Sequence, residues 1–178
     1  PLPSELERFL GEGRPPVVVT PGSANRFGES FFATALEAHE RLGIRTILVS
    51  RFREHVPHPL PRQSRHIEFA SFAQLLPRTA AIVHHGGIGT VAQALAAGIP
   101  QVIHPLSHDQ PDNGSRVARL GAGAMLEGRA FNSTRLAQTL ADLLHGTAVP
   151  ARCREISQRL VQVDPFTETC EEIERMGG

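Results

Sequence analysis

The sequence predicts an α/β domain in which a doubly wound parallel sheet of about six strands is covered by helices on both faces. Short apolar runs alternate with segments of helical periodicity every ~20–30 residues, which is typical of βαβ units. The runs, such as 17–20 (V-V-V-T), are continuous rather than alternating, as expected of strands buried on both faces. The chain has 178 residues, enough for one such domain, and we expect a single domain over 1–178.

The individual elements follow from these patterns and from their boundary residues. We expect strands at 17–20, 46–49, 66–69, 81–83, 101–103 and 124–126. We expect helices at 5–10, 31–42, 72–76, 88–97, 113–120, 133–144, 150–162 and 165–176. Ser4 is a predicted N-cap, the stretch 132–134 (N-S-T) is predicted to cap the helix that runs through Leu144, and Gly43 is predicted to end its helix. The stretches 51–65 and 105–111 contain prolines and are expected to be loops.

Composition and charge narrow the range of functions. Eighteen basic residues, all arginine, balance eighteen acidic ones, so no overall field favours nucleic acid or an anionic membrane. The absence of lysine excludes Schiff-base chemistry and a P-loop lysine. The sequence contains no apolar run of the ~20 residues that a membrane span needs, and its two cysteines suit a reducing compartment, so we expect a cytoplasmic protein. Because the chain begins at Pro1 rather than Met, we expect it to belong to a longer protein.

The segment 80–98 combines a short strand, a glycine-rich corner and an alanine-rich helix. Such a corner brings the unpaired N–H groups and the positive dipole end of the helix to the sheet edge, where they favour an anion, most often phosphate. His84 and His85 leave the strand at the same place. The corner glycines are Gly86, Gly87 and Gly89. The alternative is a tight turn that binds nothing and uses glycine only for its backbone freedom.

Four segments are expected at the carboxyl ends of the strands, where open α/β sheets bind their ligands: 21–25, 69–72, 84–89 and 105–110. Asp109 and Gln110 offer an acceptor beside an amide that both donates and accepts, which suits sugar hydroxyls, although a polar loop before a helix is equally plausible. Ser23 is either a phosphate ligand or a plain turn residue. Phe69 and Phe72 either stack on a base or belong to the core.

The sequence predicts no metal centre and no cofactor. The adjacent histidines 84 and 85 have no carboxylate at ligand spacing, which argues against zinc. The chain contains no D-x-D motif to hold a divalent cation with carboxylates.

The stretch 84–113 (H-H-G-G-I-G-T-V-A-Q-A-L-A-A-G-I-P-Q-V-I-H-P-L-S-H-D-Q-P-D-N) strongly resembles the donor-binding signature of the UDP-glycosyltransferase family. This family spans bacterial glycopeptide and macrolide glycosyltransferases and plant flavonoid glucosyltransferases. The plant form of the signature reads H-C-G-W-N-S-x-x-E, then G-V-P, then P-x-x-x-D-Q. Residues 17–23 resemble the family's V-x-x-x-G-S, and 69–77 resemble its W-x-P-Q segment. The resemblance covers nearly the whole chain.

The resemblance implies the C-terminal half of a GT-B fold, which consists of two Rossmann-like domains. In such an inverting glycosyltransferase, a UDP- or dTDP-hexose binds this half, and a small-molecule acceptor and the general base belong to an N-terminal domain. That domain is not in this chain, so we expect the chain alone to be inactive. The nucleotide sugar is a substrate, and no cofactor is implied.

The same resemblance implies roles for individual residues. The diphosphate would be contacted by Ser23, His85, Gly86, Gly87, Gly89 and Thr90. The hexose hydroxyls would be held by Asp109 and Gln110. Base and ribose would be met by Phe69, Ala70 and Gln93. Two of these depart from the family pattern, since Phe69 replaces a tryptophan and Gln93 replaces a glutamate that grips the ribose.

Three other functions remain open at this point. A dinucleotide oxidoreductase is suggested because Gly87, Gly89 and Ala92 match G-x-G-x-x-A, but that fingerprint belongs to the first βα unit of a sheet and here it follows the fourth strand. A sugar-nucleotide epimerase of the same architecture would differ in its products. A non-catalytic nucleotide-sugar-binding module would lack a partner domain carrying a base.

Overall fold

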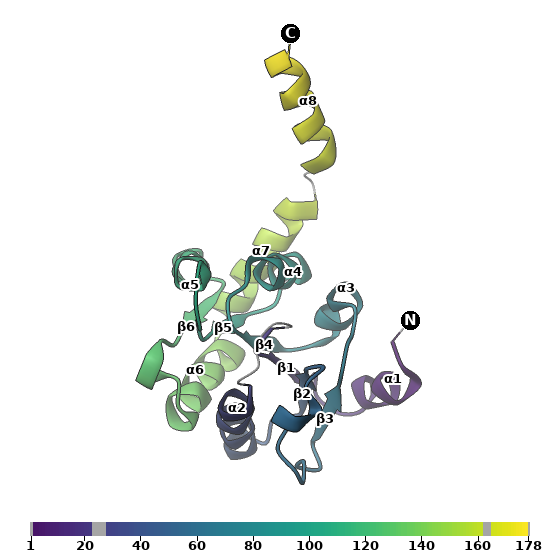
Figure 1. The fold of residues 1–178 in the computed structure, drawn as a ribbon, viewed down its shortest axis with the longest axis vertical. Helices are drawn as coiled ribbons and strands as arrows, with labels where there is room; N and C mark the ends of the chain where they lie inside the picture. The colour runs from purple at the N-terminus through teal and green to yellow at the C-terminus, as the bar shows by residue number, and fades with distance from the viewer. Residues whose placement is uncertain (1, 23–27, 162–164, 178) are drawn as a thin grey trace.

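The computed structural model describes residues 2–22, 28–161 and 165–177, and it contains one six-stranded sheet (Figure 1). All neighbouring strands pair in parallel, in the order β3-β2-β1-β4-β5-β6. The strands are β1 (Val17–Thr20), β2 (Thr46–Val49), β3 (Ser64–Ile67), β4 (Ala81–His84), β5 (Gln101–Ile103) and β6 (Gly123–Met125). The predicted parallel α/β architecture is therefore confirmed.

Helices cover both faces of the sheet (Figure 1). One face carries α2 (Glu29–Leu42) and α6 (Ser133–His145). The other carries α1 (Ser4–Gly11), α3 (Phe72–Leu75), α4 (Ile88–Ala97), α5 (Gln110–Arg119) and α7 (Ala148–Val161). The last helix, α8 (Pro165–Gly177), extends away from the sheet. Within the described ranges, no helix is both long and apolar enough to cross a membrane.

Successive side chains of a strand point to opposite faces of the sheet and pack into two separate hydrophobic cores. Val17 and Val19 pack toward α2 and α6, whereas Val18 packs toward α1, α3 and α4. All three valines are fully buried, which explains why the strand reads as a continuous apolar run rather than as an alternation.

The strand order creates a switch point between β1 and β4. From β1 the sheet grows outward to β2 and β3 on one side, and from β4 to β5 and β6 on the other. The two strands pair directly, with Thr20 opposite His84 at their carboxyl ends. In doubly wound sheets the crevice outside these ends is the ordinary ligand site.

Several predicted boundaries differ from the structure by one residue or more, and three of these differences are informative. The third strand is Ser64–Ile67 rather than 66–69, because its pairing with β2 ends at Ile67. The fifth helix begins at Gln110 rather than 113, since Pro111 lies in the first turn, where proline needs no N–H partner. Ser4 is the first residue of α1 and Pro3 is the cap, with no side-chain cap hydrogen bond.

The predicted capping stretch 132–134 does begin α6, with Asn132 as the N-cap, and removal of this cap should be measurable. The Asn132 Oδ1 accepts a hydrogen bond of 3.0 Å from the Arg135 backbone N–H. We expect Asn132→Ala to lower the free energy of unfolding by about 1 kcal/mol, and Asn132→Asp to lower it less, because Asp keeps the capping oxygen and loses only the exposed Nδ2 bonds to the Arg129 and Ala130 carbonyl oxygens. Denaturant unfolding of the two variants checks this, and equal stability of the Ala variant and wild type would contradict it.

Candidate functional site

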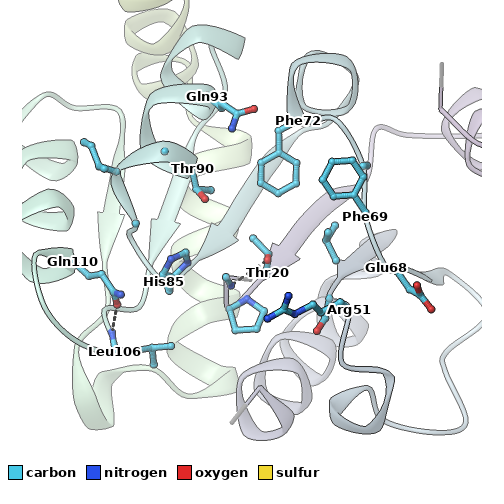
Figure 2. A pocket seen from close by; sticks show the side chains of 18 of the residues that line it. Thr20, Arg51, Glu68, Phe69, Phe72, His85, Thr90, Gln93, Leu106 and Gln110 are labelled. Atoms are coloured by element: carbon cyan, nitrogen blue, oxygen red, sulfur yellow. Dashed lines mark hydrogen bonds between the residues drawn. The ribbon is translucent and has the colours of Figure 1, made fainter. Parts of the chain in front are cut away.

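A pocket of about 1180 Å³ opens at the switch point (Figure 2). Its walls come from the carboxyl ends of β1, β2, β3 and β4 and from the loop after β5. Ligand pockets usually measure about 300–1,000 Å³, so this pocket has room for a ligand of nucleotide-sugar size.

His85 stands at the centre of the pocket wall, clamped between two glycines. A Cβ atom added to Gly22 would lie 2.6 Å from the ring Cε1, and one added to Gly87 would lie 2.5 Å from Nε2. Neither position therefore tolerates a side chain while the ring stays in place. The ring thus lies against the backbone of the turn after β1 and against the backbone at the start of α4.

The charge of His85 follows from its surroundings. Desolvation lowers the pKa of His85, while the nearby Asp109 carboxylate acts in the opposite direction and raises it. Burial is the larger effect, so the ring is neutral at pH 7 and acts as a hydrogen-bond partner rather than as a cation. Its buried Nδ1 has no hydrogen-bond partner among the described residues.

The start of α4 supplies the positive end of the site. Gly87 is the N-cap, with extended backbone and no side-chain cap hydrogen bond. The first N–H groups of the helix thus lack partners within it, as at any helix N-terminus. Gly89 and Thr90 of this first turn line the pocket, so it can accept an anion here.

His84 fixes the glycine corner through a hydrogen bond to its backbone. It is fully buried, its Nδ1 accepts from the Gly86 backbone N–H at 3.1 Å, and its Nε2 lies 2.9 Å from the Gln101 Oε1. Because a backbone N–H only donates, Nδ1 carries no proton, and the single ring proton on Nε2 is donated to Gln101. Burial lowers the pKa of His84 to about 3, so the ring is neutral.

The opposite end of the pocket is aromatic. Phe69 follows β3, is 80% exposed and lines the pocket together with Phe72 and the buried Ala70. In Figure 2 the two phenylalanine rings face Thr90 and His85 across the pocket. Exposure of so large an apolar ring beside a cavity suits stacking on a flat ligand group. Gln93 lies one helical turn beyond Thr90 on the same wall.

The loop before α5 closes the remaining side. The Gln110 Oε1 accepts from the backbone N–H groups of Leu106 and Ser107, at 2.8 and 3.0 Å, which leaves its amide donors for other partners. Asp109 is the N-cap of α5, and its Oδ2 accepts from the Asn113 Nδ2 at 2.8 Å. Asp109 does not line the pocket in the described part of the chain, but its charge acts on His85.

The structure thus brings most of the predicted residues together around one cavity. Those that line it are Phe69, Ala70, His85, Gly87, Gly89, Thr90, Gln93 and Gln110. Gly86 is buried next to His85, Asp109 is exposed next to Gln110, and Ser23 lies outside the described residues. Within the described ranges, no three histidines, cysteines or carboxylates gather to hold a metal ion.

Several lining residues were not predicted from the sequence. They are Thr20, Val49, Ser50, Arg51 and Glu68, whereas Gly22, Ile88, Leu106, Ser107 and His108 lie in the segments expected at the crevice but were given no individual role. Arg51 follows β2 and extends toward Thr20 in Figure 2, whereas the Glu68 carboxylate points away. His108 has a left-handed backbone (φ 58°), unusual outside glycine. Had the sequence predicted that β2 lies beside β1, Arg51, which follows β2, would have been expected to line the pocket.

Comparisons with known proteins agree with this geometry. Residues 42–176 match the family model described as the erythromycin biosynthesis protein CIII-like, C-terminal domain. Over 177 residues the chain is 34% identical to O-mycaminosyltylonolide 6-deoxyallosyltransferase of Streptomyces fradiae, covering 96% of this chain and 40% of that protein. It is 40% identical over 129 residues to glycosyltransferase GtfC of Amycolatopsis orientalis, covering 72% and 32%.

Solved structures show the same fold. The glycosyltransferase SnogD from Streptomyces nogalater superposes with a TM-score of 0.73 at 26% identity, covering 94% of this chain and 45% of that one. The calicheamicin glycosyltransferase CalG4 superposes with a TM-score of 0.81 at 22% identity, covering 91% and 43%. The fold is therefore that of one half of a GT-B glycosyltransferase, and the chain spans less than half the length of these relatives.

Proposed function

Because this chain belongs to the erythromycin biosynthesis protein CIII-like C-terminal domain family, we propose that it is the nucleotide-sugar-binding domain of an inverting glycosyltransferase. The donor is a UDP- or dTDP-hexose, and the acceptor is a small molecule. The observation that carries the proposal is the convergence of the α4 N-terminus, His85 and Gln110 on one pocket whose far end is lined by exposed Phe69.

The proposed geometry assigns each part of the donor to one wall. The diphosphate lies on the α4 N-terminus beside His85, the hexose faces the loop of Asp109 and Gln110, and the base stacks near Phe69. An acceptor oxygen attacks the anomeric carbon, the bond from that carbon to the diphosphate oxygen breaks, and the acceptor proton passes to a base. The α4 N-terminus and His85 stabilise the charge that grows on the leaving diphosphate.

The base and the acceptor site belong, in this proposal, to an N-terminal domain of the same protein. The proposal includes no cofactor, because the nucleotide sugar is itself a substrate. It also includes no metal, no nucleic acid and no membrane. We also propose that the protein acts in the cytoplasm. This chain alone should bind the donor without transferring the hexose.

Calorimetric titration of the chain with UDP, dTDP and their glucose esters tests the proposal. We expect His85→Ala to weaken bare nucleotide and nucleotide sugar alike, by about 1.5–3 kcal/mol, because both carry the same diphosphate. Asp109→Asn should spare the bare nucleotide and weaken the nucleotide sugar by a similar amount.

Asp112→Asn is the matched control for the second variant. Asp112 lies three residues away, is exposed and pairs with Arg116 through Oδ2 at 2.7 Å, so its loss should leave both affinities unchanged. No binding of any of the four ligands by wild type would refute the proposed function. Equal losses of UDP and UDP-glucose in Asp109→Asn would refute the sugar role of Asp109.

A further inference from the structure

The buried side-chain amide of Asn113 links the glycine corner after β4 to the N-cap residue of α5. The Asn113 Nδ2 lies 3.0 Å from the Gly86 carbonyl oxygen and 2.8 Å from the Asp109 Oδ2. An amide nitrogen has two hydrogens, so each acceptor receives one and the donor capacity of the group is fully used. Asn113 is only 9% exposed, which makes an unpaired partner there costly.

The Gly86 acceptor is held in place independently of Asn113. Gly86 has φ +94°, and an added Cβ would lie 2.8 Å from the Ile103 Cγ2, so the corner has little freedom to move. Its N–H is bound by His84, which Gln101 holds in turn. Asp109 is the N-cap of α5, one helical turn before Asn113. Hydrogen bonds therefore run without a break from Gln101 through the corner to the Asp109 carboxylate.

We infer that Asn113 is a positioning residue, which fixes the Asp109 carboxylate relative to the glycine corner so that hexose and diphosphate are bound as one unit. This inference rests on the proposed function for the identity of its ligand. Asn113 does not touch the donor itself. It acts through Asp109, and its removal should therefore affect the contribution of the hexose more than the contribution of the diphosphate.

The readout is the ratio of the Kd of UDP to the Kd of UDP-glucose, measured also with dTDP and dTDP-glucose. Asn113→Ala removes both donors, and the nearly isosteric Asn113→Asp replaces them with acceptors that face two other acceptors. We expect both variants to lower the ratio about tenfold. The control Asn132→Asp makes the same chemical change at the exposed cap of α6, keeps the cap, and should leave the ratio unchanged.

A double-mutant cycle separates positioning from a general loss of structure. If Asn113 acts through Asp109, then Asn113→Ala in an Asp109→Ala background should leave the ratio where the single Asp109 variant has it. An unchanged ratio in both Asn113 single variants, or a further tenfold fall in the double variant, would overturn the inference. Circular dichroism of each variant verifies that it is folded.

A second measurement needs no ligand. The Asp109 charge raises the pKa of His85, so a released carboxylate should let that pKa fall. In an NMR titration, Asn113→Ala should move the His85 pKa in the same direction as Asp109→Asn, and Asn132→Ala should not move it. If the wild-type chain bound none of the nucleotides, the proposed function would fail, but this titration would still test the positioning role. If the His85 pKa did not move in Asn113→Ala, the positioning role would be contradicted.

Discussion

Acidifying the protein from pH 7 to pH 5 is expected to lower its free energy of unfolding by about 4 kcal/mol, because two buried histidines stay neutral in the folded state. His39 and His84 are 1% and 0% exposed, and burial lowers the pKa of each from 6.5 to about 3. The unfolded chain binds a proton on each ring below pH 6.5, whereas the folded chain does so only near pH 3.

The direction follows from the proton count. The unfolded state binds more protons throughout the window from pH 6.5 to 3, so stability is complete above pH 6.5 and decreases as the pH falls. Each histidine contributes about 2 kcal/mol between pH 7 and 5, against the ~5–15 kcal/mol that stabilises a typical domain. Desolvation lowers the pKa values of His85 and His104 as well, which adds in the same direction.

Guanidinium unfolding at pH 7, 6 and 5 measures the effect. His39 contacts the Thr46 Oγ1 through Nδ1 at 2.7 Å, a bond that Asn can imitate without titrating. We expect His39→Asn to show about half the pH dependence of wild type, and His145→Asn, at an exposed position, to show all of it. Equal wild-type stability at pH 7 and 5 would disprove the expectation.

Gly87→Ala is expected to weaken UDP binding as much as His85→Ala does, and to lower stability by about 1–3 kcal/mol. The backbone at Gly87 (φ −60°, ψ 136°) suits any residue, so the whole effect comes from the added methyl group. That methyl group would lie 2.5 Å from the His85 Nε2 and would displace the ring from its position between Gly22 and Gly87.

The His85→Ala background provides the decisive comparison. Once the ring is gone, nothing opposes the methyl group, so Gly87→Ala should there cost less than about 0.5 kcal/mol in stability and in UDP affinity. Gly22→Ala should behave differently, because its φ of +93° strains any side chain whether or not the ring is present. If the effects of Gly87→Ala and His85→Ala were additive in both measurements, Gly87 would not be needed to leave space for the His85 ring.

Much of the fold was predictable because the four central strands, β1, β2, β4 and β5, are short, buried and mostly apolar. The errors have physical causes. Aromatic residues favour strands, so Phe69 was placed in the third strand, although it leaves the sheet for the pocket, where it is 80% exposed. Proline is expected in loops, so α5 was predicted to begin at 113, three residues too late.

The second error also hid part of the site. With α5 starting at 113, Asp109 and Asn113 belonged to different elements, whereas with α5 starting at Gln110 they lie one turn apart and bond. Arg51 was missed because neighbouring strands are set by topology, and no local pattern shows that β2 lies beside β1. The left-handed backbone of His108 has only a weak signal in its residue type, since histidine is enriched at positive φ but adopts it rarely.

The pairing of β1 with β4 also bears on how the chain acquires its pocket. In the chain, β2 and β3 lie between Thr20 and His84, so a fragment must contain at least four strands before it has both walls of the pocket. Such non-local contacts form slowly, because the connecting chain must be ordered first. If the chain binds a donor nucleotide as proposed, that ligand would stabilise by mass action the four strands that form the pocket rather than one loop.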